Sequence, residues 1–289
     1  MTSKDLLLQP NQISRAAYKC DCTERKIIFF AALKVQKEHY QLCKMDLSGY
    51  VAKFRISEML KALNIPNQTK TRKMVKDAIK TIAEQTITIT DTDNRLIILN
   101  WLQQGSYDDK SNTIELVFTD AVGRLFCECR DCFSLLSPVV IGSLHSYYSM
   151  RYYELAMSYA GLNPWVFTLT IEQIRTMYQI DSYTGANGTN NFITKVVSSP
   201  INELNAINPD FHIDVVKIPD ETDKRKLSAI RFVCTRTATK PKRRAKTTGE
   251  KIRERVDSER AQTADAYSAY LAQGGNLMQS ITSNRGGKQ

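Results

Sequence analysis

The chain has 289 residues, of which 42% are hydrophobic, and it carries a formal net charge of +10. That length is sufficient for two domains of ordinary size, and the excess of basic residues favours a polyanionic partner, nucleic acid before an anionic membrane. No apolar run is long enough to cross a bilayer, and the first residues lack the apolar stretch of a secretion signal. We therefore expect a cytoplasmic protein that does not associate with membranes.

Cysteine usage argues against both a disulfide framework and a metal site. The seven cysteines are an odd number, and the only cluster is Cys127, Cys129 and Cys132. Cys20 and Cys22 could complete a set of zinc ligands, but their spacing is tight and the histidines are scattered. We expect reduced thiols, no bound metal and no other cofactor.

The first half of the chain is expected to contain helices separated by short strands. Asp21 or Thr23 can cap the first helix, and Ser57 is a suitable N-cap for the second. Strict alternation after Gln85 predicts a strand that returns after a tight turn as a hairpin. The expected elements are helix 24–37, strand 50–56, helix 58–64, helix 70–85, strands 86–91 and 95–101, strand 112–119 and short apolar helices within 120–143.

The second half is expected to repeat this order. Thr170 and Gln173 form a capping box at the start of a helix. The expected elements are helix 145–160, strand 166–170, helix 171–178, helix 190–206 and a hairpin of strands 210–218 and 227–235. The pairs that correspond at an offset of roughly 120 residues are Ser57 with Thr170, Thr69 with Thr189, and Thr86 with Phe211. This recurrence predicts two copies of one small domain.

A helix–turn–helix followed by a hairpin is the plan of a winged helix. The predicted fold class is therefore α+β, with two tandem winged-helix domains over 1–143 and 144–236. Beyond Arg236 the sequence is basic and polar, which predicts a disordered tail over 237–289. We expect the residues from about 240 onward to add non-specific affinity for DNA without being needed for specific recognition.

The helix 70–85 has one apolar side and one basic side. Lysine is a point charge on a flexible stem, so it suits phosphates better than base edges. We expect this face to supply affinity with little selectivity, the alternative being an ordinary solvated lysine face. Its candidate DNA contacts are Lys70, Arg72, Lys73, Lys76 and Lys80.

The helix 190–206 presents hydrogen-bonding side chains where strong helix formers would be expected on a mere surface helix. Asparagine, lysine, threonine and serine can all contact base edges in the major groove. The alternative is a poor surface helix held by its core. Pro200 removes one backbone hydrogen bond and predicts a kink. The candidate base contacts are Asn191, Thr194, Lys195, Ser198, Asn202 and Asn205.

The helix 145–160 is rich in tyrosines, which we expect to fill the groove between the two domains, while Arg151 is a further candidate for phosphate contact. The tyrosine spacing in "YSMRY" also matches that of rolling-circle nicking enzymes, but the closely spaced histidine pair that would hold their metal is missing. A phosphate-binding loop is missing as well. We therefore expect no enzymatic activity. The tyrosines are Tyr147, Tyr148, Tyr152, Tyr153 and Tyr159.

Three stretches in this order resemble the iteron-binding plasmid replication initiators. The first is "NQISRAAYKCDCTERKIIFFAAL", the second "LHSYYSMRYYELA" and the third "FITKVVSSPINELN". The second stretch matches through Ser146 or Ser149, Arg151, Tyr153, Glu154 and Leu155. The third matches through Phe192, Val196, Pro200, Glu203, Leu204 and Asn205. The resemblance spans about residues 8–235 and includes neither the cysteine cluster nor the basic tail.

This resemblance implies a non-enzymatic protein that binds direct repeats in double-stranded DNA at a plasmid origin. It further implies that monomers bind the repeats and help to melt an adjacent AT-rich segment. Homodimers, joined through the first domain, would repress the protein's own promoter. The implied host partners are the replication initiator, the replicative helicase and chaperones. A plasmid or phage transcriptional regulator with no direct role in replication is the alternative, and an RNA-binding protein is disfavoured because no aromatic RNA-binding strand motif is found.

Overall fold

The computed structural model describes residues 6–42, 49–90, 95–129, 132–184, 188–223 and 226–237. Residues 1–240 form one compact unit. The predicted disordered tail lies outside the described residues from residue 238 onward. No helix in the described ranges is both long enough and apolar enough to span a membrane.

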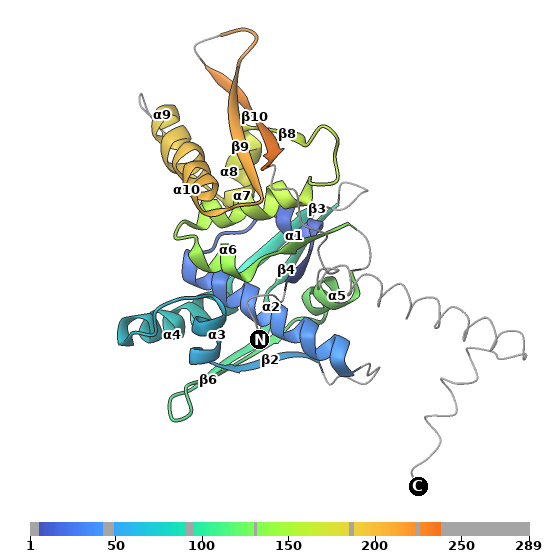
Figure 1. The fold of residues 1–289 in the computed structure, drawn as a ribbon, viewed down its shortest axis with the longest axis vertical. Helices are drawn as coiled ribbons and strands as arrows, with labels where there is room; N and C mark the ends of the chain where they lie inside the picture. Colours follow the sequence, from blue (N-terminus) through green and yellow to red (C-terminus); the bar gives the residue numbers. More distant parts are fainter. Residues whose placement is uncertain are drawn as a thin grey trace, which may run out of the picture. The chain divides into compact units, whose positions relative to one another are not determined.

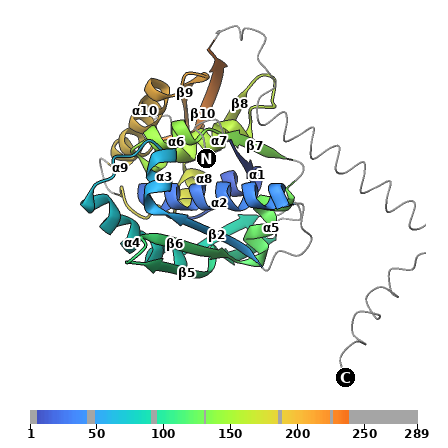
Figure 2. The same ribbon diagram turned by 60° about the horizontal axis from the view of Figure 1, so that its bottom comes forward.

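The first half is built around one long buried helix, α2. Asp21 caps this helix, because its Oδ1 accepts the N–H of Glu24 at 2.7 Å while the Glu24 carboxylate accepts the N–H of Asp21 at 2.8 Å. Figure 2 shows α2 with strand β2 on one side and helices α6 and α7 on the other. The first half contains β1 (Leu7–Pro10), α1 (Asn11–Arg15), α2 (Cys22–Leu42), β2 (Tyr50–Arg55), α3 (Ile56–Ala62), α4 (Thr69–Glu84), β3 (Thr86–Thr90), β4 (Leu96–Asn100), β5 (Leu102–Asp108) and β6 (Thr113–Phe118).

The connecting region and the second half follow in the same compact unit (Figure 1). The capping box of Thr170 and Gln173 is present in full at the start of α8, as predicted. The connecting region contains α5 (Asp120–Glu128), β7 (Phe133–Leu136) and α6 (Pro138–Ser143). The second half contains α7 (Tyr147–Ser158), β8 (Val166–Thr170), α8 (Ile171–Tyr178), α9 (Gly188–Phe192), the π-helix η1 (Ile193–Ser198), α10 (Ser199–Ile207), β9 (Phe211–Pro219) and β10 (Leu227–Arg236).

One three-stranded topology occurs twice. In the order β2-β6-β5, the strand that precedes α3 pairs antiparallel with the second strand of the β5–β6 hairpin. In the order β8-β10-β9, the strand that precedes α8 pairs in the same way with the second strand of the β9–β10 hairpin. The α+β winged-helix class predicted from the sequence is therefore confirmed.

The predicted identity of the first wing is wrong. Strands β3 and β4 do form a hairpin, but it is a separate two-stranded sheet, and the wing is β5–β6. The counterpart of Phe211 is consequently near Leu102 instead of Thr86. The sequence does not predict β5, because "LQQGSYD" is polar and mostly exposed and lacks the alternation that is typical of a half-buried strand.

One prediction at a helix start needs correction, and the helix around Pro200 shows how the predicted loss of a backbone hydrogen bond is accommodated. Ser57 is not an N-cap, because α3 begins at Ile56 with Arg55 at the capping position. A π-helical turn lies immediately before Pro200. In this turn the N–H of Ser199 donates a hydrogen bond to the carbonyl of Thr194. The proline lacks an N–H and its ring would collide with a carbonyl one turn earlier, so a wider turn accommodates it.

Candidate nucleic-acid interface

Helix α4 has the two-sided character that its sequence predicts. Val75, Ala78, Ile79 and Ile82 are buried against the core. Four of the five basic candidates are exposed, namely Lys70, Arg72, Lys73 and Lys80. These four side chains are available to a polyanion.

Lys76 differs from the other basic residues of α4 because it contacts the first wing. Its ammonium group forms an ion pair with Asp109 and lies 4.4 Å from the centre of the Tyr107 ring. The hydrogen bond to Asp109 raises the pKa of Lys76. Part of its charge is therefore already compensated within the protein.

The turn of the first wing is acidic. Asp108 and Asp109 are adjacent in it, and Asp108 accepts hydrogen bonds from the N–H of Lys110 at 2.9 Å and from the hydroxyl of Ser111. Lys110 lies in the same turn and Lys76 pairs with Asp109, so the tip offers a phosphate backbone no excess of positive charge. In the first half, the face of α4 is thus the better candidate for DNA contact.

The second long helix consists of α9, η1 and α10, and it presents most of its predicted face to solvent. Ile193, Val196, Val197 and Leu204 are buried, as expected from the sequence. Asn191, Thr194, Lys195 and Asn202 are exposed, and Ser198 is half-buried. These side chains supply donors and acceptors on one face of a helix in the recognition position of a winged helix.

Asn205 has a different role from the one predicted. Its Nδ2 donates to the carbonyl of Ile213 at 2.9 Å, and its Oδ1 accepts the N–H of Ile213 at 2.8 Å. Both hydrogen-bonding groups of the amide are therefore used to fix strand β9 against the helix. Asn205 therefore positions the second wing and is no longer a candidate for base contact.

Arg151 is also reassigned, because its side chain is 0% exposed. Its guanidinium donates to the carbonyl of Ala16 at 2.7 Å, forms an ion pair with Glu154 at 3.2 Å and bonds the hydroxyl of Tyr18. A buried guanidinium with these partners cannot reach a phosphate. The predicted phosphate contact at Arg151 is wrong.

Glu154 is shared by two buried guanidinium groups, those of Arg151 and Arg25. Arg25 Nε lies 2.7 Å from the carboxylate, and all three side chains are fully buried. Burial raises the pKa of Glu154, but the two guanidinium groups outweigh it and keep the pKa below its usual value. We call these three residues the buried charge cluster; it joins α2, α7 and the segment before α2.

The opposite side of α7 packs on the second-half sheet. The Tyr153 ring stacks on Phe211 with an interplanar angle of 4°, and the centroid of Tyr152 lies 5.3 Å from that of Phe232. Both tyrosines are buried. Both contacts lie within the second half, whereas the hydroxyl of Tyr147, on the same helix, donates to the carbonyl of Tyr18 in the first half at 2.8 Å.

Glu203 connects the second long helix to α7. Its carboxylate accepts the N–H groups of His145 at 2.7 Å and Ser146 at 3.2 Å, and the hydroxyl of Ser149. Partial burial raises the pKa of Glu203, but these hydrogen bonds outweigh it and lower the pKa. An anion here also suits the positive end of α7. The sequence indicates Glu203 only as part of a motif, because its hydrogen-bond partners lie more than fifty residues away along the chain.

The cysteine cluster shows no site geometry in the part of the chain that the structure describes. No group of three histidine, cysteine or acidic side chains is arranged there to hold a metal ion. Cys127 is buried, and burial raises the pKa of its thiol to about 12. Cys129 is half-buried and Cys132 is exposed.

Residues 6–157 match the family described as "Initiator Replication protein, WH1". The chain belongs to this family of initiator replication proteins. No curated protein matches it significantly in sequence.

Several solved structures resemble the chain. One is the Pi initiator protein in complex with iteron DNA, with 15% identity, a TM-score of 0.57, and coverage of 82% of this chain and 100% of that one. It shows a shared fold. Domains 2 and 3 of RctB match with 10% identity, a TM-score of 0.43, and coverage of 73% and 82%. The WH1 domain of the replication protein MSBI1.176, isolated from a multiple sclerosis patient, matches with 19% identity, a TM-score of 0.27, and coverage of 36% and 78%.

Proposed function

We propose that the protein initiates replication of a plasmid by binding direct repeats in its origin. The exposed polar face of η1 and α10 reads base edges, and the basic face of α4 holds the phosphate backbone. The observation that carries this proposal is the polar face itself, because Asn205 and Glu203 fix the helix on both sides while Asn202 and Lys195 remain exposed. Family membership and the shared fold with an initiator bound to iteron DNA support it.

The proposal extends, by resemblance to the family, to opening of the origin and recruitment of the host initiator, helicase and chaperones in the cytoplasm. A direct test is a plasmid that carries the gene and its flanking DNA as the only source of replication. A frameshift in the gene should abolish maintenance, and the intact gene supplied from a second replicon should restore it. Maintenance of the frameshifted plasmid without help would favour the alternative, a transcriptional regulator.

A salt titration tests the proposed role of α4. Lys73→Ala should weaken binding to cognate and scrambled DNA equally and lower the slope of log K against log salt by about one unit, the effect of one lost phosphate contact. Lys76→Ala is the matched control and should have a smaller effect, because Asp109 already compensates its charge. Loss of discrimination in Lys73→Ala would show that α4 reads sequence instead.

We further propose that β4 forms the contact of a homodimer, in equilibrium with the monomer. Leu96, Ile97 and Ile98 are 66%, 39% and 62% exposed, although neighbouring residues of a strand normally face opposite sides. Strand β3 pairs with β4 along one edge, and along its other edge Thr88 forms a bridge with Ala17. Within the described residues β4 is therefore the exposed edge strand of this sheet. An exposed apolar edge strand favours pairing with a second copy.

Lysine substitutions test this dimer. In a sedimentation experiment the double variant Leu96→Lys and Ile98→Lys should be mostly monomeric. Like charges would face each other across the contact and would weaken the dimer. Leu162→Lys, at a side chain that is 50% exposed outside the sheet, is the control and should leave the equilibrium unchanged. A double variant with the dimer content of the parent would rule out β4 as the contact.

A further inference from the structure

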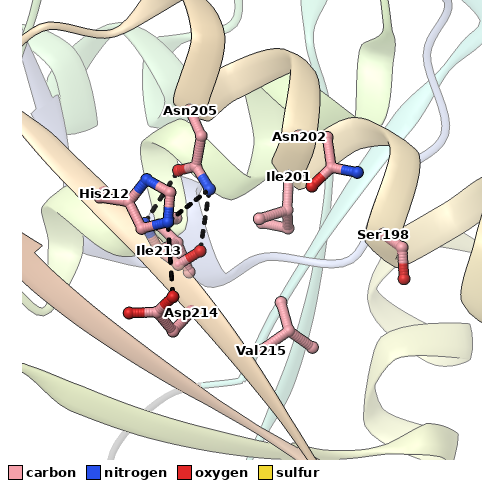
Figure 3. Close-up of a pocket in the computed structure, with 8 residues that line it drawn as sticks. All are labelled: Ser198, Ile201, Asn202, Asn205, His212, Ile213, Asp214 and Val215. Atoms are coloured by element: carbon pink, nitrogen blue, oxygen red, sulfur yellow. Dashed lines mark hydrogen bonds and ion pairs between the residues drawn. The ribbon is translucent and has the colours of Figure 1, made fainter.

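A pocket of about 200 Å³ lies between the second long helix and strand β9. Figure 3 shows Ile201 pointing from the helix toward the strand and Val215 pointing from the strand toward the helix. With Ile213 these side chains give the pocket apolar walls. Its rim carries Ser198 and Asn202, which lie one helical turn apart.

The charge at the pocket disfavours a phosphate as the occupant. Asp214 lies at the rim with its side chain 64% exposed, and its carboxylate is 3.4 Å from His212 Nε2. Among the described residues that line the pocket, none is a lysine or an arginine. A phosphate would meet an acceptor and no fixed cation, whereas an apolar group would meet the side chains of Ile201 and Val215.

The place of the pocket on the helix face further limits the chemical group that it can bind. This step rests on the proposed function. The rim is part of the face that would enter the major groove, and the only apolar group that base pairs present there is the C5-methyl of thymine. We propose that this pocket receives the C5-methyl of a thymine in the repeat. Asn202 stands at the same rim, so the thymine belongs to the adenine·thymine pair that Asn202 contacts or to its neighbour.

Removing single methyl groups from the DNA tests the proposal. Each thymine of a footprinted repeat is replaced in turn by deoxyuridine, which removes the methyl and leaves base pairing intact. One such replacement should weaken binding about fourfold, which corresponds to the burial of one carbon group. The other replacements should have little effect.

A protein variant then locates the contact. In Val215→Ala the ratio between thymine and deoxyuridine at the sensitive position should fall to about one, because the wall that contacts the methyl is gone. Val216→Ala, on the exposed face of the same strand, is the matched control and should keep the fourfold ratio. A fourfold ratio that persists in Val215→Ala would place the methyl elsewhere and overturn the proposal.

Two further results separate this proposal from the proposed function. If every deoxyuridine duplex binds like the parent repeat while scrambled DNA still binds more weakly, the pocket does not read thymine and repeat binding stands. If parent and scrambled DNA bind equally, sequence-specific repeat binding fails and the pocket proposal fails with it.

Discussion

Replacing Glu154 with Gln should lower the free energy of unfolding by about 3–5 kcal/mol, the cost of leaving buried charges without their partner. Arg25 and Arg151 are both 0% exposed, and the Glu154 carboxylate is 2.7 Å from one and 3.2 Å from the other. The neutral amide keeps the shape of the side chain but removes the negative charge. Urea denaturation of parent and variant at neutral pH measures the difference.

A second Glu→Gln change provides the control. Glu58 pairs with Lys34 at 3.0 Å, but the two side chains are 35% and 20% exposed. Water screens such a pair, so Glu58→Gln should cost less than about 1 kcal/mol. A Glu154 variant as stable as the Glu58 variant would mean that the buried charge cluster contributes little to the fold.

The pH dependence of stability follows from the direction of the Glu154 shift. The two guanidinium groups hold the pKa of this carboxyl below its unfolded value. Its contribution is therefore fully present above the ordinary carboxyl pKa and is lost as the pH falls through the lowered value. The parent should lose more stability on acidification than the Gln variant, which has no carboxyl group at this position.

Asn202→Ala and Lys195→Ala should each cost about 1–3 kcal/mol on the cognate repeat and leave binding to random DNA nearly unchanged. Both side chains are exposed, whereas Asn205 on the same helix is hydrogen-bonded to Ile213 of β9. A base contact is lost only where the matching base is present, so the loss should be confined to the cognate site. Fluorescence anisotropy with both DNAs measures it.

The matched control for Asn202 is Asn100→Ala, an exposed asparagine in the first half that lies beyond Leu96, Ile97 and Ile98, the side chains of the proposed dimer contact. It should bind both DNAs as the parent does. Equal weakening of cognate and random DNA by Asn202→Ala would show a backbone contact and would remove the second long helix as the main reader of sequence.

Local patterns in the sequence were sufficient where the structure depends on local interactions. Strand β8 and helix α8 lie where expected, and the capping box at Thr170 forms as predicted. The buried side of α4 also follows from its periodicity. In these elements each residue is positioned by neighbours within one or two turns, so the pattern contains the necessary information.

Long-range interactions decided the features that the sequence did not predict. Strand β1 is four residues long and forms only because β7 pairs with it from more than 120 positions away. Arg151 and Asn205 have the side chains of DNA contacts, but Glu154 with Ala16 and the backbone of Ile213 take up those groups. A polar side chain is free for a ligand only if the fold has not already used it, which the residue type alone does not reveal.

Footprinting of the purified protein on the DNA that flanks its own gene tests the central proposal most directly. We expect protection of several short direct repeats at regular spacing, and we expect Asn202→Ala to lose this protection at concentrations where Asn100→Ala keeps it. Uniform protection without boundaries, or no protection of repeated sequence at any concentration, would contradict the proposal that this protein initiates replication by binding repeats.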